Sequence, residues 1–396
     1  MLPFLAAVPA FLAIITVIIT VHELGHFLTA RACGIAVDRF SIGFGPTLWA
    51  RRDKAGVEWR VAWLPLGGYV RFAGDDNVAS VPDAEDLDEL RRHIVLKEGV
   101  GAEKRYFFFK PLWQRALVVL AGPAINFVLS IALFAGLVGA FGEWTPTLQI
   151  DRVEPGTGAA RAGLMRGDTI LAVDGQGLAS YDDFQTYVRD RPETPMKLTI
   201  QRAGHVLDIA ATSGVQFEKS PAGGVSRLGL LGVESALMHR TYGPIAAVGR
   251  GAQMTWGIVA KTGHYLGRVI EGKIDWPFSG VIGTAHVTGT LTQEAVDISA
   301  TEHVSLFETL AVQYVYLAAL LSTSIGLVNL LPIPILDGGH LLFYGYEAVA
   351  RRPLPAGAQA AGYRVGLALL VGLMLFTAWH DLQGLQVFHF LGHLFS

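Results

Sequence analysis

Two histidines and a glutamate end an uncharged apolar run near the start of this 396-residue chain. The run, residues 4–21, has no ionisable side chain and is long enough to cross a hydrocarbon core as a helix. It leads directly into His22-Glu23-Leu24-Gly25-His26. Ionisable groups at membrane depth are energetically costly and are therefore functional candidates. The sequence predicts a polar functional site in or beside a membrane span.

The spacing of these residues suits one metal ion. Residues four apart lie one turn apart on the same helix face, so His22 and His26 can bind the same ion. Glu23 lies one position round from His22, where it can exchange protons with a water activated by the metal without being a ligand. The alternative is a chance H-E-x-x-H on an ordinary helix, buried as a satisfied polar cluster. The adjoining apolar span favours the metal site.

The composition indicates a membrane protein. Hydrophobic residues make up 51% of the chain and charged residues 16%, and the mean hydropathy is +0.40, above the usual balance of a soluble domain. No basic patch in the sequence points to nucleic acid. The single cysteine, Cys33, excludes an intramolecular disulfide framework. The N-terminus lacks the basic region of a signal peptide, so we expect the first span to be retained.

Three further apolar runs are long enough to be spans. They are residues 113–141, about 310–331 and 363–379. Four spans place both termini on the same side of the membrane.

The positive charges near the span ends predict the orientation. Lys and Arg gather in the loops 27–112 and 340–360, and neither occurs after Trp379. By the positive-inside rule these two loops are cytoplasmic, whereas both termini and the segment 142–305 are extracytoplasmic. The His and Glu residues then lie towards the cytoplasmic end of the first span.

The segment after the second span opens with another recognisable pattern. A predicted strand at 148–153 is followed by A-G-L-M-R-G-D-T-I-L-A-V-D-G at 162–175, a helix at 181–189 and strands at 196–202 and 205–211. The run closely resembles the PDZ domains attached to bacterial proteases, which bind an extended peptide as an added strand. The alternative is a generic small β domain that acts as a spacer.

The rest of this segment predicts less. Apolar positions recur at helical spacing over 243–269, with Arg250, Lys261 and Arg268 turned to water. Such a helix lies in the membrane interface or packs as an ordinary connector, and the sequence leaves both open.

Together these patterns predict a polytopic α-helical membrane protein with four transmembrane helices and an inserted extracytoplasmic α+β PDZ domain. The expected order is two spans with a cytoplasmic membrane-associated β element, the PDZ domain, a connector with an amphipathic helix, and the last two spans. The corresponding ranges are 1–141, 142–214, 215–305 and 306–396.

The third span ends in a motif that can complete the metal site. The run N-L-L-P-I-P-I-L-D-G-G-H at 329–340 has two prolines where a membrane helix should continue. Non-helical backbone is tolerated at membrane depth only inside protein or against a water-filled cavity. Asp337 can give a carboxylate oxygen to a zinc ion held by two imidazoles, leaving the fourth position for water. A simple turn at the span end is the alternative, and the histidine motif favours the ligand.

These motifs resemble those of the site-2 protease family of intramembrane zinc metalloproteases, most closely the regulator of sigma-E protease (RseP-like) branch. The resemblance covers essentially the whole chain. It includes F-S-I-G-F-G-P at 40–46, P-L-G-G-Y-V at 65–70 and G-P-A-I-N-F at 122–127. One departure is that well-known members of this branch carry two tandem PDZ domains and this chain one, so their way of screening substrate size does not carry over directly.

The resemblance implies an enzyme with one catalytic Zn²⁺ bound by His22, His26 and Asp337, with Glu23 as the base. The implied substrate-binding residues are Asn329, Asn126 and a strand-like element that pairs with unwound substrate, Gly67, Gly68, Tyr69 and Val70. The implied partners are membrane lipid and single-pass membrane proteins already cut by another protease, such as anti-sigma factors, membrane-anchored regulators or remnant signal peptides. The implied location is the bacterial inner membrane.

Three other classes share parts of this pattern. A metal transporter or sensor can use His and Asp in its spans but does not require Glu23 beside the first ligand. A catalytically silent scaffold can bind peptides through the PDZ domain alone. A soluble-type zinc protease anchored by one span would not draw its ligands from two spans. The variant Glu23→Gln discriminates, because a protease loses turnover while still holding zinc.

Overall fold

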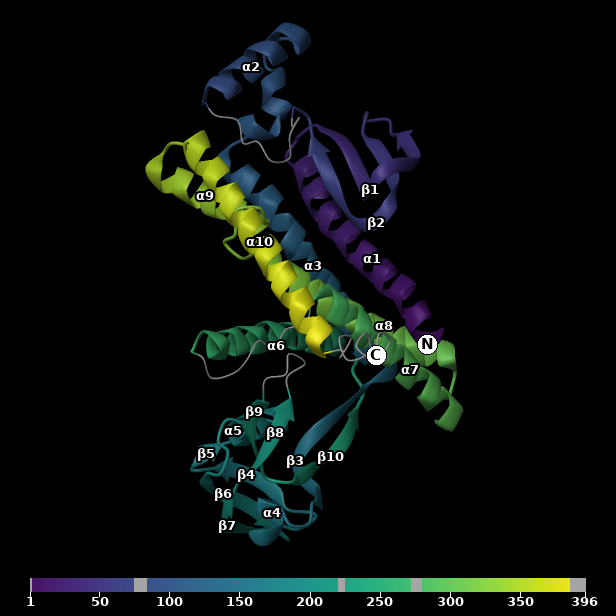
Figure 1. The fold of residues 1–396 in the computed structure, drawn as a ribbon, viewed down its shortest axis with the longest axis vertical. Coiled ribbons are helices and arrows are strands. Elements are labelled where there is room, and N and C mark those ends of the chain that lie inside the picture. The colour runs from purple at the N-terminus through teal and green to yellow at the C-terminus, as the bar shows by residue number, and fades with distance from the viewer. Residues whose placement is uncertain (1, 75–83, 220–224, 272–279, 303, 385–396) are drawn as a thin grey trace, which may run out of the picture. The chain divides into compact units, whose positions relative to one another are not determined.

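The computed structural model describes residues 2–74, 84–219, 225–271, 280–302 and 304–384 (Figure 1). The chain divides into two compact units. A helical unit consists of residues 1–137, 246–262 and 279–379. A sheet unit consists of residues 138–245, 263–278 and 380–396.

Four helices of the described chain are long and apolar enough to cross a membrane. They are α1 (Leu2–Ala32), α3 (Leu112–Phe141), α8 (Leu306–Asn329) and α10 (Ala356–Gly384). These are the four spans that the sequence predicts, and the polytopic helical fold is confirmed. Helix α10 leaves large apolar side chains exposed, among them Leu369 and Phe376, as a lipid-facing helix does.

Helices α1 and α3 pack with their backbones in close approach. A Cβ atom added at Gly25 of α1 would lie 2.5 Å from the carbonyl oxygen of Ala121 in α3. Only glycine fits such a contact, because any side chain would push the helices apart. The glycine inside H-E-L-G-H therefore brings α3 directly against the histidine face of α1.

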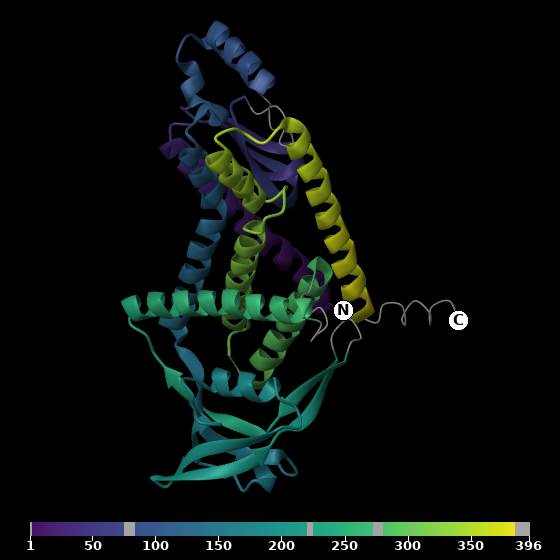
Figure 2. The same ribbon diagram turned by 90° about the vertical axis from the view of Figure 1, so that its left-hand side faces the viewer.

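Strands β1 (Val37–Arg52) and β2 (Glu58–Phe72) form a small sheet beside the end of α1 that follows the histidines (Figures 1 and 2). Both strands bend, so that residues 39–42 of β1 pair with residues 58–61 and also with residues 68–71 of β2. The 68–71 part of β2 pairs on one edge only within the described sheet.

Smaller elements complete the helical unit. They are α2 (Ala84–Glu98), the 3₁₀ turns η1 (Ala102–Arg105) and η2 (Phe107–Phe109), α7 (Val281–Glu302) and α9 (Asp337–Ala350). Helix α7, which the sequence patterns do not predict, packs on α1 and α8, and Thr292 in α7 hydrogen-bonds to Tyr314 in α8 at 2.8 Å. An apolar core under the small sheet contains Phe27, Phe40 and Val118.

For helix α6 (Pro244–Ile270), the sequence leaves open whether it lies in the membrane interface or packs as an ordinary connector. Its 246–262 part runs across the direction of the spans in both views of the ribbon (Figure 2). One face packs on α3, where an added Cβ at Gly251 would lie 2.6 Å from the Ile131 carbonyl oxygen. The other face exposes Val248 and Trp256. The helix is thus packed on one side and has the crosswise orientation and apolar exposure of an interfacial helix on the other.

The sheet unit is built on an antiparallel sheet in the order β10-β3-β4-β6-β7, with β5 added beside β4. Its elements are β3 (Glu143–Val153), α4 (Gly158–Arg161), β4 (Thr169–Val173), β5 (Gln176–Gly177), α5 (Tyr181–Arg189), β6 (Pro195–Arg202), β7 (His205–Thr212), β8 (Gly214–Lys219), β9 (Val225–Leu230) and β10 (Val233–Arg240). The strands and the helix predicted for the PDZ domain all form. Because β10 pairs with β3, the sheet continues past the predicted boundary at residue 214.

A buried carboxylate fixes the G-D pair of the PDZ-like motif. Asp168 is 1% exposed and accepts two hydrogen bonds of 2.7 Å from Arg202 and one of 2.8 Å from the Met165 N–H. Burial opposes ionisation, but these hydrogen bonds and the positive charge outweigh it and lower the pKa of Asp168.

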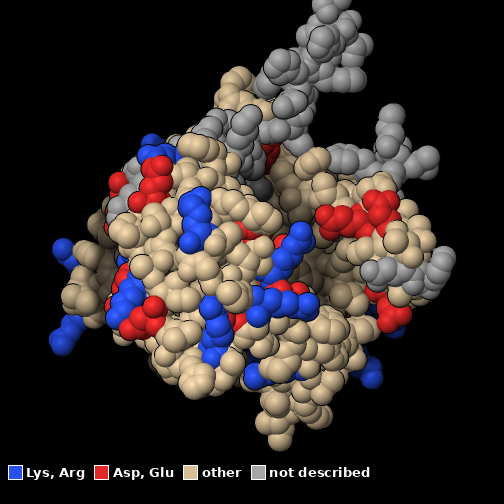
Figure 3. Space-filling view, turned by 90° about the horizontal axis from the view of Figure 1, so that it is seen from below, with Lys and Arg blue, Asp and Glu red and all other residues tan. Residues whose placement is uncertain are grey.

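On the surface seen in Figure 3, basic and acidic side chains lie interspersed.

Candidate active site

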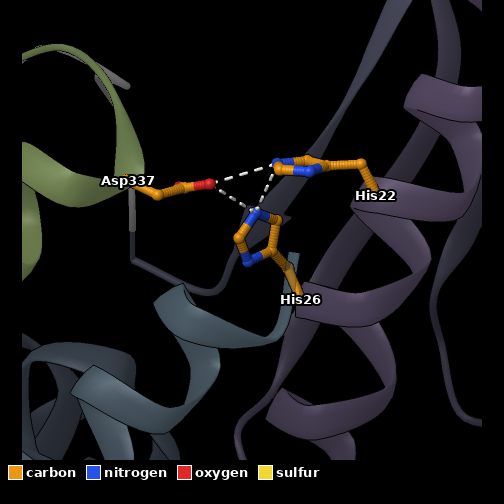
Figure 4. A group of neighbouring side chains, drawn as sticks. All are labelled: His22, His26 and Asp337. Atoms are coloured by element: carbon orange, nitrogen blue, oxygen red, sulfur yellow. Dashed lines mark hydrogen bonds and ion pairs between the residues drawn. The ribbon is translucent and has the colours of Figure 1, made fainter. Parts of the chain in front are cut away.

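Helix α1 presents His22 and His26 on one face, as their four-residue spacing predicts. Their Nε2 atoms lie 3.1 Å apart and their ring centroids 4.8 Å apart, in an edge-to-face arrangement (Figure 4). His22 is 6% exposed. Two imidazole nitrogens thus point to one place in a partly buried site.

Asp337 enters from the irregular segment that follows α8 and is the first residue of α9. Tight backbone hydrogen bonds close this segment, and it needs the two glycines that follow Asp337. Added Cβ atoms at Gly338 and Gly339 would lie 2.3 Å from the carbonyl oxygens of Leu331 and Ile333. The D-G-G run is therefore the start of helix α9, and the irregular segment before it brings the Asp337 side chain to the site.

The Asp337 carboxylate points at both histidines (Figure 4). Its Oδ2 atom lies 3.1 Å from Nε2 of His22 and 3.5 Å from Nε2 of His26. The three residues are the one metal-binding group found among the described residues, with donor atoms within 4.8 Å of one another.

This donor set fits zinc. Two imidazole nitrogens and one carboxylate oxygen form a common three-residue ligand set for catalytic zinc, with a fourth position open. Gly122 of α3 keeps space beside the donors, since an added Cβ there would lie 2.3 Å from His26 Nε2 and 2.8 Å from His22 Cε1. Oδ2 of Asp337 is buried and has no hydrogen-bond donor among the described residues, and its polar neighbours are the two Nε2 atoms.

Both imidazoles are held from behind by α3. Nδ1 of His26 lies 2.8 Å from the carbonyl oxygen of Val118. Because a carbonyl only accepts, Nδ1 carries the proton and Nε2 is left with its lone pair towards Asp337. Nδ1 of His22 lies 3.2 Å from the side-chain amide of Asn126.

Glu23 lines the same cavity as the three donor residues. The backbone of Val70 hydrogen-bonds to its carboxylate. Its Cγ atom lies 3.4 Å from where a Cβ of Gly68 would be. Glu23 is thus placed beside the donor group, on the side of strand β2, where a general base is needed.

The cavity has a volume of about 730 Å³ and lies within the helical unit. Of the predicted substrate-binding residues, Asn329, Gly68, Tyr69 and Val70 line it. Gly67 is buried behind them, where an added Cβ would lie 2.8 Å from the Phe44 ring. Asn126 has no exposed surface and hydrogen-bonds to His22, so its side chain does not face the cavity in this structure.

The cavity also contains an ion pair that no sequence motif predicts. Arg115 of α3 contacts Glu347 of α9 at 2.5 Å, and its guanidinium lies 5.0 Å from the Tyr344 ring centroid. Burial raises the pKa of Tyr344, so this phenol stays protonated. In the sequence, the only sign that Arg115 belongs to the site is its charge at the start of an apolar span. Glu347 and Tyr344 carry none, because only the packing of α9 brings them there.

Comparison with known proteins places this site in a family. The model described as peptidase family M50 matches residues 10–373, a range that includes all three donor residues. The chain belongs to this family of site-2-type proteases, and it is a multi-pass membrane zinc metalloprotease.

Relatives along the whole chain agree. The metalloprotease MmpA of Caulobacter vibrioides is 45% identical, with 100% of both chains covered. A putative zinc metalloprotease of Agrobacterium fabrum is 36% identical over 95% of both chains. The regulator of sigma-E protease RseP of Escherichia coli is 29% identical, covering 97% of this chain and 100% of RseP. The predicted family, enzyme class and zinc cofactor are confirmed.

Among solved structures, the PDZ domain of an SdrC-like protein from Listeria monocytogenes is similar to 23% of this chain. It has 16% identity, 88% of its own length covered and a TM-score of 0.19. The description of the sheet unit as PDZ-like rests on its sequence motif and strand order.

Proposed function

We propose that this protein cleaves transmembrane segments of single-pass membrane proteins, at a zinc ion held by His22, His26 and Asp337. One observation carries the proposal. The three donor atoms and Glu23 face one cavity of about 730 Å³, formed where residues following the third span meet the first span. A soluble-type protease held by one anchor does not build its ligand set from two spans.

The chemistry follows from the side chains around the donor group. Bound zinc supplies Lewis-acid chemistry, which makes water a better nucleophile and a peptide carbonyl a better electrophile. Glu23 is not a ligand and takes a proton from the attacking water, then passes it to the leaving amine. The hydrogen bond from the Val70 backbone holds the Glu23 carboxylate in place for both transfers.

The substrate is bound as a strand. A peptide bond inside a helix is shielded and its carbonyl is already hydrogen-bonded, so a transmembrane helix has to unwind before it is cut. The 68–71 part of β2 offers an edge without a partner strand in the described sheet, and Gly68, Tyr69 and Val70 line the cavity. Pairing with this edge compensates the unwound backbone. Asn329 lines the same cavity and holds the substrate near the donor group.

The protein lies in the bacterial inner membrane, with both termini and the sheet unit outside the cytoplasm. The distribution of Lys and Arg near the span ends supports this orientation. The cut then falls near the cytoplasmic side. Its substrates are membrane-anchored regulators such as anti-sigma factors, or remnant signal peptides, shortened beforehand by another protease.

The PDZ-like sheet unit acts as a size filter or docking site for the shortened substrate. A substrate series with extracytoplasmic parts of increasing length tests this role on the full-length enzyme. A filter gives a sharp fall in cleavage above one length, whereas equal cleavage of the whole series contradicts it.

The variant Glu23→Gln tests the proposed activity, with the exposed Glu89→Gln in α2 as the control. Removing a general base should lower turnover of a single-pass substrate by about 10²–10⁴-fold. Bound zinc, measured by mass spectrometry of the metal, should stay at the wild-type level. A Glu23→Gln enzyme that cleaves as fast as Glu89→Gln contradicts the proposal. Membrane fragments that accumulate in cells carrying Glu23→Gln identify the substrates.

A further inference from the structure

We propose that Asn126 is a positioning residue whose side-chain oxygen accepts the Nδ1 proton of His22 and leaves Nε2 free for zinc. The inference rests on the proposed zinc ligands His22, His26 and Asp337. It gives Asn126 a role other than the substrate contact that family resemblance implies.

The burial of Asn126 separates it from any substrate. Its exposed fraction is 0%, and it lies outside the lining of the cavity, which does include Asn329. A Cβ added at Gly326 of α8 would lie 3.3 Å from the Asn126 Cβ atom, so α8 covers this residue closely. A substrate strand beside β2 therefore meets Asn329 and not Asn126.

Residue Asn126 is held firmly from its other side. The Ser322 hydroxyl of α8 donates a 2.8 Å hydrogen bond to the Asn126 carbonyl oxygen, and Ser322 is also fully buried. The backbone of Asn126 is thus fixed at the junction of two spans. A residue so fixed can set the direction of an imidazole ring that it contacts.

The contact with His22 has a required direction once a metal binds. An asparagine amide fills the same space in either of two orientations, with oxygen or nitrogen towards its neighbour. One end lies 3.2 Å from His22 Nδ1, and the other has no hydrogen-bond partner among the described residues. The hydrogen-bond partners of Asn126 therefore do not determine which end of its amide faces His22. A metal on Nε2 does, because Nδ1 must then carry the proton and needs an acceptor.

The second histidine is supported in the same way by the same helix. His26 Nδ1 faces the Val118 carbonyl oxygen at 2.8 Å. Val118, Gly122 and Asn126 follow one another at four-residue intervals and so lie along one face of α3. The face offers an acceptor for His26, open space beside both rings, and an acceptor for His22. The glycine and asparagine of G-P-A-I-N thereby support the H-E-L-G-H histidines.

Zinc retention by the full-length protein tests the inference. Purified variants are titrated with a zinc chelator, and the bound zinc is measured at each chelator concentration. The variants are Asn126→Ala, which removes the acceptor, and Asn126→Asp, which keeps an oxygen but loses the amide donor. The matched control is Ser130→Ala, one turn further along α3. Ser130 is fully buried and hydrogen-bonds to Thr255 and Thr323, without a contact to either histidine.

The expected result is a loss of zinc affinity of about 10–100-fold in Asn126→Ala, the usual effect of removing an outer partner of a ligand. Asn126→Asp and Ser130→Ala should stay near the wild type. Three results would overturn the inference: wild-type affinity in Asn126→Ala, equal losses in Asn126→Asp and Asn126→Ala, or an equal loss in Ser130→Ala. A further variant, His22→Ala, separates the two proposals. If it binds zinc as tightly as the wild type, the ligand assignment itself fails.

Discussion

On one side of the donor group, His22 and His26 stand on a long helix and are braced by a second one. Their Nδ1 atoms contact Val118 and Asn126 of α3, and Gly122 lets that helix approach the rings. On the other side, Asp337 stands at the end of an irregular turn. Its Oδ2 has no hydrogen-bond donor among the described residues, and its polar neighbours are the two Nε2 atoms.

This difference indicates that the fold positions the two imidazoles, whereas the metal positions the Asp337 carboxylate. The imidazoles are held by contacts with α3 that do not involve the ion. A buried carboxylate oxygen without a hydrogen-bond donor depends on the cation for its charge compensation. We therefore expect the histidine side to be preorganised and the Asp337 side to become ordered when zinc binds.

The largest effect should come from filling the space that α3 leaves beside the histidines. In Gly122→Ala the new methyl group would lie 2.3 Å from His26 Nε2. Overpacking costs about 1–3 kcal/mol, and 1.4 kcal/mol corresponds to roughly tenfold in affinity. Zinc affinity and proteolysis should fall together by about tenfold or more.

The matched control for this prediction is Gly136→Ala in the same helix, where an added Cβ would meet no atom of the described chain within 4 Å. Zinc titration and substrate cleavage check both variants. Equal behaviour of the two alanine variants would contradict the view that α3 shapes the metal site.

A smaller effect should appear on removing the metal from the wild type. Amide hydrogen exchange of residues 331–339 should speed up by about tenfold, since each tenfold reflects about 1.4 kcal/mol of lost local stability. Exchange at residues 22–26 and 118–126 should change little. Mass spectrometry of peptides from the metal-free and zinc-loaded protein measures this. An equal increase on both sides would remove the distinction between them.

The smallest effect concerns Asp168, a buried carboxylate that, unlike Asp337, has several hydrogen-bond donors. Asp168 has donors from Arg202 and the Met165 backbone, and its pKa is lowered overall although burial opposes this. Its stabilising contribution is therefore present above the unfolded pKa of about 3.9 and is lost as pH falls through the lower folded pKa. The protection of β4 and β6 amides against hydrogen exchange, taken relative to the intrinsic exchange rate at each pH, should fall severalfold between about pH 6 and about pH 3.

The variant Arg202→Met should remove most of that pH dependence. The control is Arg166→Met, which breaks an exposed pair with Asp151 and should have little effect. If Arg202→Met keeps the wild-type pH profile, Asp168 is not held as described. Asp168 could then no longer serve as the example of a fully hydrogen-bonded carboxylate with which Asp337 is compared.

Much of this fold can be predicted from local sequence patterns. Apolar runs predict the four spans, and the alternation and turn residues of 148–211 predict the strands and helix of the sheet unit. The donor residues His22, His26 and Asp337 carry motifs, and the structure brings them together. The order of the motifs along the chain does not by itself place them in space, but family resemblance does.

What the sequence does not predict depends on packing between distant elements. Helix α7 has no strong apolar face of its own, and contacts with α1 and α8 stabilise it. Strand β10 belongs to the sheet because it pairs with β3 far back in the chain. The direction of the Asn126 side chain depends on the rotation of α3 against α1. A motif marks such a residue as important without saying which neighbour it faces.

The central claim is that two histidines of the first span and Asp337 bind one zinc ion. X-ray absorption at the zinc edge of the purified full-length protein tests it most directly. The account predicts nitrogen and oxygen ligands at about 2.0–2.2 Å, outer-shell scattering from two imidazoles that falls when His22 is replaced by alanine, and no sulfur. A sulfur shell at about 2.3 Å, which would implicate Cys33, or imidazole scattering unchanged in His22→Ala, would contradict it.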